Sequence, residues 1–408
     1  MKSHFTSTFF SGNRNILRSL HKNSGAIVLT ANGLLQRNND MAYPFRQDSN
    51  FWYLAGLDLP DAVLIIDNNA EYIILPKRGA HQETFDGALD ISALRLQSGI
   101  DQILDFEAGW ARLSGQIKRA KQVTSLIPPP EYIEAYSFYT NPARAALIGK
   151  LNQTKSGLEL IDARQNLATM RMIKQKPELA AMRQAIDITV ETLKDVVGQL
   201  KDYKYEYEIE ADLLNGFRKK GASGSSFPSI VAAGKNACTI HYMANSGSLK
   251  NTRFVLLDVG AEVENYAADI GNTFWLAERT TREDNVYNVV LDVQSYAYSL
   301  LKPGMLMKDF EKQIEHYMGG KLQQLGLINS SEREEIRKYF PHATSHHVGL
   351  DAHDIADYDK PLQAGMVVTV EPGIYIPAEK IGVRIEHDVL ITDTGIEVLS
   401  KNMPAGLS

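Results

Sequence analysis

Short apolar runs separated by turn residues predict β-strands in the first part of the chain. Residues 25–30 read GAIVLT, and residues 62–66 and 72–75 flank a polar stretch as the two arms of a β-hairpin do. Helical spacing of apolar residues follows around 108–121 and near 142–151, and three successive prolines at 128–130 impose an extended break between them. The mixture predicts an α/β unit.

The pattern changes near residue 170. Pro177 and Glu178 form a good helix start, since proline suits the first turn and an acid suits the positive end of the helix dipole. Apolar residues at three- and four-residue spacing predict that this helix runs over 177–200. Strand patterns dominate beyond it, at 253–260, 263–276, 367–370, 374–376 and 383–391. We therefore expect two domains, 1–168 and 169–408.

Composition excludes several classes of protein. A length of 408 residues allows two or three domains, and a net charge of −6 gives no electrostatic footprint for nucleic acid. No apolar stretch is long enough for a membrane span or a secretory signal, so we expect a cytoplasmic protein. The single cysteine, Cys238, excludes an intrachain disulfide and a cysteine-based metal site.

Two aspartates stand where carboxylates are costly. Asp258 interrupts the apolar run FVLLDVG, and Asp269 precedes a second apolar run eleven residues later. Each alone could be a turn residue that caps a strand end. If the two strands form a hairpin, however, the carboxylates lie side by side, and like charges at close range need a cation between them.

Further candidate ligands follow in the second domain. Glu371 in VVTVEPGIYI and Glu386 in GVRIEHDVLI are also set in apolar runs, and four carboxylates balance two divalent cations. Four of the ten histidines cluster at 342–353. An imidazole ligand favours Mn²⁺, Co²⁺, Fe²⁺ or Zn²⁺ over Mg²⁺. We therefore predict a site for two divalent cations.

These phrases resemble a known family. The order Asp, Asp, His, Glu, Glu, with LLDVGAEVENYAADIGNTF, SHHVGLDAHD, VVTVEPGIYI and GVRIEHDVLI, is similar to the pita-bread metallopeptidases, which include methionine aminopeptidase, prolidase and aminopeptidase P. The stretch MAYPFRQDSNFWYLAGLDLPDAVLII resembles the N-terminal domain of aminopeptidase P and creatinase. The implied fold class is α+β, with a C-terminal pita-bread catalytic domain behind an N-terminal α/β domain.

The resemblance implies a role for each candidate residue. Asp258 would bind one metal, Asp269 and Glu386 would bridge the pair, and His346 and Glu371 would complete the second metal. Glu371 would also shuttle a proton to and from a metal-bridging hydroxide that attacks the peptide carbonyl. The remaining candidates support catalysis: His241 and His353 would hydrogen-bond the carbonyl oxygen, His342 would line the substrate pocket, and Arg384 would orient a ligand carboxylate.

The resemblance also implies a substrate. His342, His353 and Arg384 together favour the proline-specific branch, whose aminopeptidases remove a first residue that precedes proline. Prolidase, with the same site but acting on Xaa-Pro dipeptides, stays open as an alternative, as does a metal-free relative that only binds peptides. The implied cofactor is a pair of divalent ions, Mn²⁺ first and Co²⁺ or Zn²⁺ otherwise. The implied partners are peptides with proline second and a further copy of the chain, as a homodimer or homotetramer, without nucleic acid or membrane.

Overall fold

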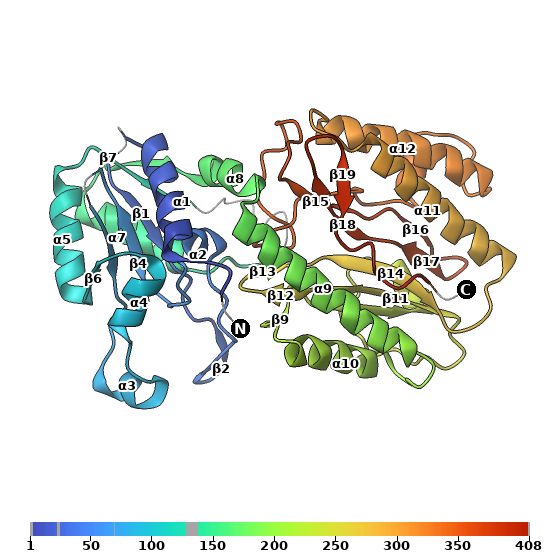
Figure 1. The fold of residues 1–408 in the computed structure, drawn as a ribbon, viewed down its shortest axis with the longest axis horizontal. Coiled ribbons are helices and arrows are strands. Elements are labelled where there is room, and N and C mark those ends of the chain that lie inside the picture. The colour runs from blue at the N-terminus through green and yellow to red at the C-terminus, as the bar shows by residue number, and fades with distance from the viewer. Residues whose placement is uncertain (1–2, 23–24, 69, 128–137, 407–408) are drawn as a thin grey trace. The chain divides into compact units, whose positions relative to one another are not determined.

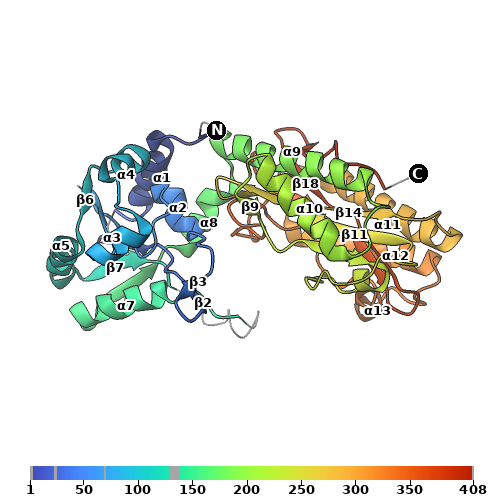
Figure 2. The ribbon, with the colours of Figure 1, turned by 90° about the horizontal axis from the view of Figure 1, so that it is seen from below.

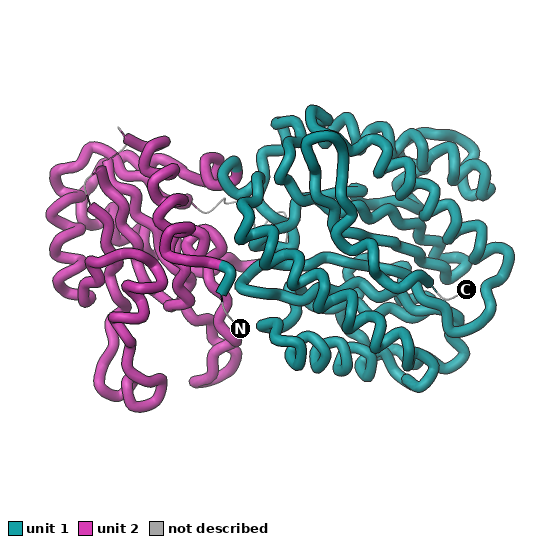
Figure 3. Tube along the Cα trace, viewed as in Figure 1, with its two compact units in different colours: residues 1–4, 169–408 teal, residues 5–168 magenta. Residues whose placement is uncertain are grey.

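The computed structural model describes residues 3–22, 25–68, 70–127 and 138–406. It divides into two compact units, one of residues 5–168 and one of residues 169–408 with the N-terminal residues up to His4 (Figure 3). The proline run at 128–130 lies outside the described residues. No helix within the described ranges is long and apolar enough to cross a membrane.

The first unit is built on a six-stranded mixed sheet in the order β6-β5-β4-β1-β7-β8. The predicted hairpin is confirmed, because β4 (Val63–Ile66) and β5 (Glu71–Ile74) pair antiparallel. The other strands are β1 (Ile27–Thr30), β6 (Gln102–Leu104), β7 (Gln122–Ser125) and β8 (Glu159–Asp162), with a separate ribbon of β2 (Gln36–Asn38) and β3 (Met41–Ala42). Figure 1 shows helices on both sides of this sheet.

The spacing of apolar residues predicted two helices in the first unit, and both are present. These two are α5 (Phe106–Arg119) and α7 (Ala143–Thr154). The others are α1 (Ser7–Leu20), α2 (Ser49–Ala55), α3 (Ala80–Asp86) and α4 (Ile91–Ser98), while α8 (Arg164–Met172) begins in the first unit and ends in the second. Apolar residues of β1, β4, β5, α5 and α7 form one buried core.

Two pairs of helices enclose the strands of the second unit. The first pair is α9 (Lys176–Gly198) and α10 (Glu206–Lys219), and the second is α11 (Thr281–Leu300) and α12 (Met307–Gln324), as Figures 1 and 2 show. The predicted start of α9 is confirmed: Pro177 lies in the first turn, and the Glu178 carboxylate accepts a hydrogen bond from the Gln175 amide at 2.8 Å. A short helix α13 (Arg333–Arg337) follows α12.

The strands of the second unit form three-stranded sheets and a two-stranded ribbon. One sheet has the order β10-β11-β14, from Ile230–Ala233, Phe254–Val259 and Ile270–Trp275. The second is β13-β12-β9, from Tyr266–Ala267, Ala261–Val263 and Gly224–Ser225. The third is β15-β18-β19, from Val367–Val370, His387–Ile391 and Ile396–Val398, and the ribbon joins β16 (Gly373–Ile376) to β17 (Ile381–Arg384).

Side chains that alternate along β11 belong to two different hydrophobic cores. Val255, Leu257 and Val259 pack with the core under α9 and α10, whereas Phe254 and Leu256 pack with the core under α11 and α12. Successive side chains of a strand point to opposite faces, so both faces are apolar and the strand is buried on both sides. Asp258 lies on the same face of β11 as Phe254 and Leu256. The separate helices and mostly antiparallel strands of this unit confirm the predicted α+β fold class.

Two strand predictions were wrong in detail. The region 263–276 is not one strand, because Glu264 and Asn265 adopt φ values of 47° and 67° and form a tight turn between β12 and β13. The region 383–391 is also interrupted: β17 ends at Arg384, and β18 begins at His387. Glu386 therefore lies between two strands, where its direction is not fixed by regular alternation.

Candidate metal centre

The antiparallel pairing of β11 with β14 brings the two aspartates together. Asp258 lies opposite Gly271, and Asp269 immediately precedes β14. Their exposed fractions are 7% and 5%. Burial raises the pKa of both carboxyls, and in Asp269 the neighbouring Asp258 charge raises it further. Two neighbouring buried carboxylates repel each other, so the pair favours the binding of a cation.

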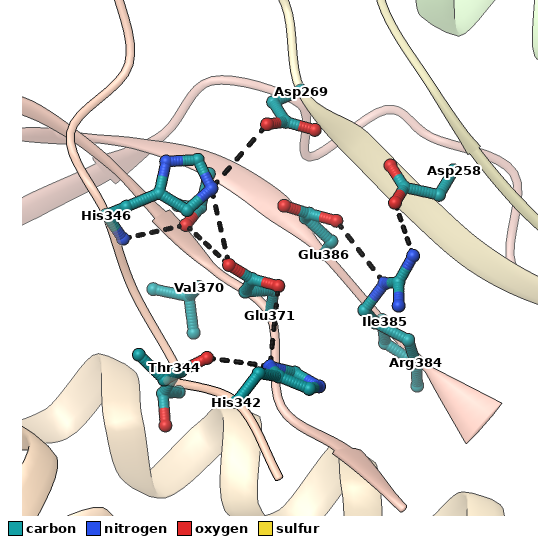
Figure 4. Close-up of polar contacts among 12 residues, drawn as sticks. Asp258, Asp269, His342, Thr344, His346, Val370, Glu371, Arg384, Ile385 and Glu386 are labelled. Atoms are coloured by element: carbon teal, nitrogen blue, oxygen red, sulfur yellow. Dashed lines mark hydrogen bonds and ion pairs between the residues drawn. The ribbon is translucent and has the colours of Figure 1, made fainter. Parts of the chain in front are cut away.

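The Asp258 carboxylate satisfies only one of its oxygens within the protein. Its Oδ2 accepts a hydrogen bond from the Arg384 guanidinium, whereas its buried Oδ1 has no hydrogen-bond partner among the described residues (Figure 4). A buried oxygen without a donor is costly. A divalent cation that takes this oxygen as a ligand would remove that cost, so the residues fit a metal.

Glu386 is placed by its backbone. Its amide donates to the Gly271 carbonyl at 2.7 Å, and the Gly271 amide donates back at 3.2 Å. A Cβ at position 271 would lie 3.2 Å from Glu386 Oε2, so the glycine leaves room for the carboxylate. Burial, together with the charges of Asp269, Glu371 and Asp258, raises the pKa of Glu386 well above its usual value.

His346 and Glu371 face each other from neighbouring segments. The His346 carbonyl accepts a hydrogen bond from the Thr369 amide at 2.9 Å, which aligns this segment with β15. His346 Nε2 lies 3.3 Å from Glu371 Oε1 and 3.6 Å from Asp269 Oδ2 (Figure 4). Burial lowers the pKa of His346, but the two carboxylates outweigh burial and raise it to about 9.

The pKa of Glu371 reflects the same contact with His346. Burial would raise it, but the hydrogen bond and charge of His346 lower it to about 2. Without a cation, the Arg384 guanidinium pairs with Asp258, and the positive charge nearest Glu371 and Asp269 is the His346 imidazolium. Divalent cations would replace it more fully, and a neutral imidazole could then act as a ligand.

The five predicted ligands form overlapping groups. Ligand atoms of Asp258, Asp269 and Glu386 lie within 4.8 Å of one another, and so do those of His346, Glu371 and Glu386. Glu386 belongs to both groups, as expected of a bridging ligand. A third group joins Asp269 and His346 to His353, so the structure also allows His353 to approach a metal. Carboxylate oxygens with one imidazole suit Mn²⁺, Co²⁺ or Zn²⁺.

The remaining predicted residues surround this cluster. His342 Nε2 lies 2.8 Å from the hydroxyl of Tyr375, and Arg384 donates to the same hydroxyl at 2.9 Å. The His353 ring lies 4.0 Å from the His346 ring, centroid to centroid. His241 stands on the exposed loop after the 3₁₀ helix η1 (Gly234–Cys238). The segment that carries His342 and His346 is not helical.

All nine predicted residues line one pocket of about 650 Å³. Its other walls are mostly apolar, with Phe227, Ile240, Met243 and Tyr358 among them. Such a combination, an apolar cavity with convergent polar groups, is typical of a small-ligand site. The arrangement can hold cations at its floor and a short peptide against its walls.

Sequence reasoning missed Tyr375 and the support beneath the histidines. Tyr375 lies four residues after Glu371, and a Cβ at Gly373 would approach its hydroxyl to 2.5 Å, so Gly373 lets the tyrosine lie along β16 toward Arg384. The two-residue period of a strand could have found it. Glu311, which accepts the Thr344 amide with both oxygens at 3.0 and 2.9 Å, left no such signal.

A buried ionic cluster holds the loop of His353. Asp354 accepts hydrogen bonds from Arg171 and, at 2.9 Å, from Lys174 Nζ, and all three side chains are 1% exposed. Arg171 also bonds Asp351 at 2.7 Å. Burial alone would raise the pKa of Asp354, but the charges of Arg171 and Lys174 lower it overall. The loop is thus tied to the segment at the end of α8.

Comparisons with known proteins agree with this geometry. Residues 180–393 match the family described as metallopeptidase family M24, and residues 10–124 match the aminopeptidase P N-terminal domain. The Xaa-Pro aminopeptidase of Haemophilus influenzae is 33% identical over 93% of this chain and 91% of its own length. Human Xaa-Pro aminopeptidase 3 is 29% identical over 93% of this chain and 78% of its own.

Solved structures resemble the whole chain. Aminopeptidase P of E. coli with the inhibitor Pro-Leu superposes with a TM-score of 0.88 and 28% identity, covering 99% of this chain and 97% of that one. A zinc-substituted form of the same enzyme with product gives a TM-score of 0.85 over the same shares. The relatives and the solved structures agree with the two family models on the catalytic fold and the N-terminal domain. This chain therefore belongs to metallopeptidase family M24, in its aminopeptidase P branch.

Proposed function

We propose that this enzyme is a dinuclear-metal aminopeptidase that hydrolyses the bond between a first residue and a following proline. The observation that carries the proposal is the convergence of four carboxylates, four histidines and one arginine on one mostly apolar pocket. The named Xaa-Pro aminopeptidases at about the same length support the substrate. We propose Mn²⁺ as the native metal, and the cytoplasmic location and homo-oligomer stay predictions.

In this proposal Asp258, Asp269, His346, Glu371 and Glu386 would hold the two cations. When bound, the cations would activate water for attack and polarise the scissile carbonyl. Arg384 fixes the Asp258 carboxylate through the bond to Oδ2, and Oδ1 would be left to bind a cation. The hydrogen bond and charge of His346 lower the pKa of Glu371, so this carboxylate is ionised at neutral pH.

The protein groups then act on the peptide. Glu371 would accept the proton of the attacking water and deliver it to the departing proline nitrogen, which becomes a secondary amine. His241 and His353 would donate hydrogen bonds to the carbonyl oxygen as negative charge develops there. A penultimate proline offers no N–H, so a pocket that binds it through apolar contact suits it better than one lined with acceptors.

A peptide panel tests the proposal. The metal-free protein is loaded in turn with Mn²⁺, Co²⁺ and Zn²⁺, and each form is assayed on an Xaa-Pro dipeptide, an Xaa-Pro-Yaa-Zaa tetrapeptide and the matching Xaa-Ala-Yaa-Zaa. We expect cleavage of the tetrapeptide that contains proline and little cleavage of its alanine counterpart. Cleavage of the dipeptide alone would show a prolidase, and no cleavage with any metal would show a relative that only binds peptides.

Loss of a catalytic histidine separates chemistry from metal binding. We expect His241→Ala and His353→Ala to retain both cations and to lose roughly 100-fold in kcat, as for a lost oxyanion donor. Metal content by mass spectrometry and kcat on the proline tetrapeptide provide the measurement. The control is His316→Ala, which changes an exposed histidine of α12. Metal loss from His353→Ala would instead make His353 a ligand, as its contact with Asp269 and His346 allows.

A further inference from the structure

The loop that carries His241 has no regular secondary structure of its own. It follows η1 and continues to Ser248, and it places Ile240, His241 and Met243 on the wall of the pocket. His241 is exposed, so the surrounding core does not fix its imidazole. The position of that ring therefore depends on how firmly the loop backbone is held.

One buried carboxylate from α10 holds this loop at several points. Glu206 Oε1 accepts hydrogen bonds from the Ala233 amide and from Asn236 Nδ2, both at 2.8 Å. Its Oε2 accepts the hydroxyl of Tyr242 at 2.9 Å and the amide of Gly247. The Glu206 side chain is completely buried, and two of its four donors lie before the His241 loop and two within it.

The loop is shaped to admit this carboxylate. A Cβ at Gly247 would lie 2.7 Å from Glu206 Oε1 and 2.6 Å from Asn236 Nδ2, so a side chain at position 247 would collide with the contact. The Glu206 amide also donates to the Gly247 carbonyl at 3.0 Å. Asn245 adds a second anchor, because its amide group bonds the backbone of Val231 at 3.0 Å and of Ser229 at 2.8 Å.

Charge matters at this position as well as shape. An ionised carboxylate accepts on both oxygens, and bonds to a charged acceptor are about twice as strong as neutral ones. A glutamine of the same size would turn an N–H₂ group toward two of the four donors. The backbone on one side of the His241 loop would then lose its acceptor, although the volume of the core would not change.

We propose that Glu206 is a positioning residue that acts through His241. By fixing the loop on both sides of the imidazole, it sets the distance from His241 to the substrate carbonyl without touching substrate or metal. This inference rests on the proposed function, in which His241 donates to that oxygen. Outer partners that orient a catalytic group contribute about 10-fold to 100-fold, and a shift of about 1 Å in such a group is enough to cause a loss of this size.

The first test compares two glutamates of one helix. Glu206→Gln is expected to lower kcat by roughly 10-fold or more, with KM changed by less than about 2-fold and both cations retained. Glu208→Gln makes the same change two residues further, on an exposed carboxylate that bonds the Lys204 and Tyr205 amides and not the loop. If the two variants have the same kcat, the inference is wrong, while wild-type activity on the peptide panel leaves the proposed function standing.

A double-mutant cycle shows whether the effect passes through His241. In a His241→Ala background, Glu206→Gln should lower kcat by less than about 2-fold, because the group that it positions is absent. An equal loss in both backgrounds would overturn the inference and indicate a general structural role. Hydrogen exchange of the metal-free protein gives a readout without activity: peptides over 233–247 should exchange faster in Glu206→Gln, and unchanged exchange would also overturn it.

A milder variant covers the case in which Glu206→Gln does not fold. Tyr242→Phe removes one of the four donors and leaves the charge and the core volume in place. It should lower kcat by a smaller factor, about 3-fold, and this loss should disappear in the His241→Ala background. A Tyr242→Phe enzyme with wild-type kcat, or with the same loss in both backgrounds, would contradict the proposal.

Discussion

Glu386→Ala should leave the enzyme without measurable turnover and without bound metal. Glu386 belongs to both ligand groups at the floor of the pocket, so its removal takes an oxygen from each. The other ligands cannot compensate, since Gly271 opposite offers no side chain and Asp258 is already held by Arg384. Neither cation then has the coordination that the wild-type cluster provides.

Thermal unfolding with and without Mn²⁺ measures this directly. A ligand at 100 times its Kd stabilises the native state by about 2.7 kcal/mol, so the wild-type Tm should rise with added Mn²⁺ and the Glu386→Ala Tm should not. Without metal, the variant should be at least as stable as wild type, because one of four mutually repelling carboxylates is gone. Glu397→Ala is the control, as it removes a half-exposed carboxylate of β19 that pairs with Arg183. A variant that keeps two cations would contradict the ligand assignment.

Asp354→Asn should lower the free energy of unfolding by about 3–5 kcal/mol. The change leaves the Arg171 and Lys174 charges buried with their shared counter-charge removed, which is the costly way to break a buried ion pair. Denaturant unfolding of the metal-free protein gives the measurement. Asp351→Asn is the matched control on the same loop: this carboxylate is 40% exposed, so we expect a loss of about 1 kcal/mol or less.

The difference between wild type and Asp354→Asn should depend on pH. The pKa of Asp354 is lowered in the folded protein, while an unfolded aspartate titrates near ~3.9. The stabilisation is therefore complete above that value and is lost as the pH falls through the lower folded pKa. The two stability curves should converge at acid pH. Curves that stay parallel would assign the loss to packing instead of charge.

The sequence predicted the helices and strands whose boundaries are set by residues close to them in the chain. The β4–β5 hairpin and α9, with its Pro177 start, follow from turn residues and apolar spacing within a few positions. The helices α11 and α12 were not predicted, although their buried apolar residues recur at three- and four-residue spacing. The break between β17 and β18 was missed because apolar residues continue across it, from Val383 in β17 through Ile385 to Val389 in β18.

Four of the five candidate ligands were visible because each is an acid in an apolar run, and His346 was visible as part of a histidine cluster. Their supports were not visible, because what Glu206, Glu311 and Asp354 do depends on partners that only tertiary structure supplies. Glu206 is the first residue of α10, and Asp354 contacts residues about 180 positions earlier. No pattern of period two or 3.6 encodes such a pairing, so it must be read from the fold.

The spread of the ligands along the chain governs when the protein can acquire metal. Asp258 and Glu386 are 128 positions apart in the sequence, and the last ligand is needed by both groups. At ~5–20 residues per second, a ribosome takes roughly 6 to 26 s to synthesise that interval. A nascent chain that does not yet include Glu386 therefore exposes the earlier acidic ligands without a complete site. Under the proposed ligand assignment, metal loading therefore follows synthesis of the last strands.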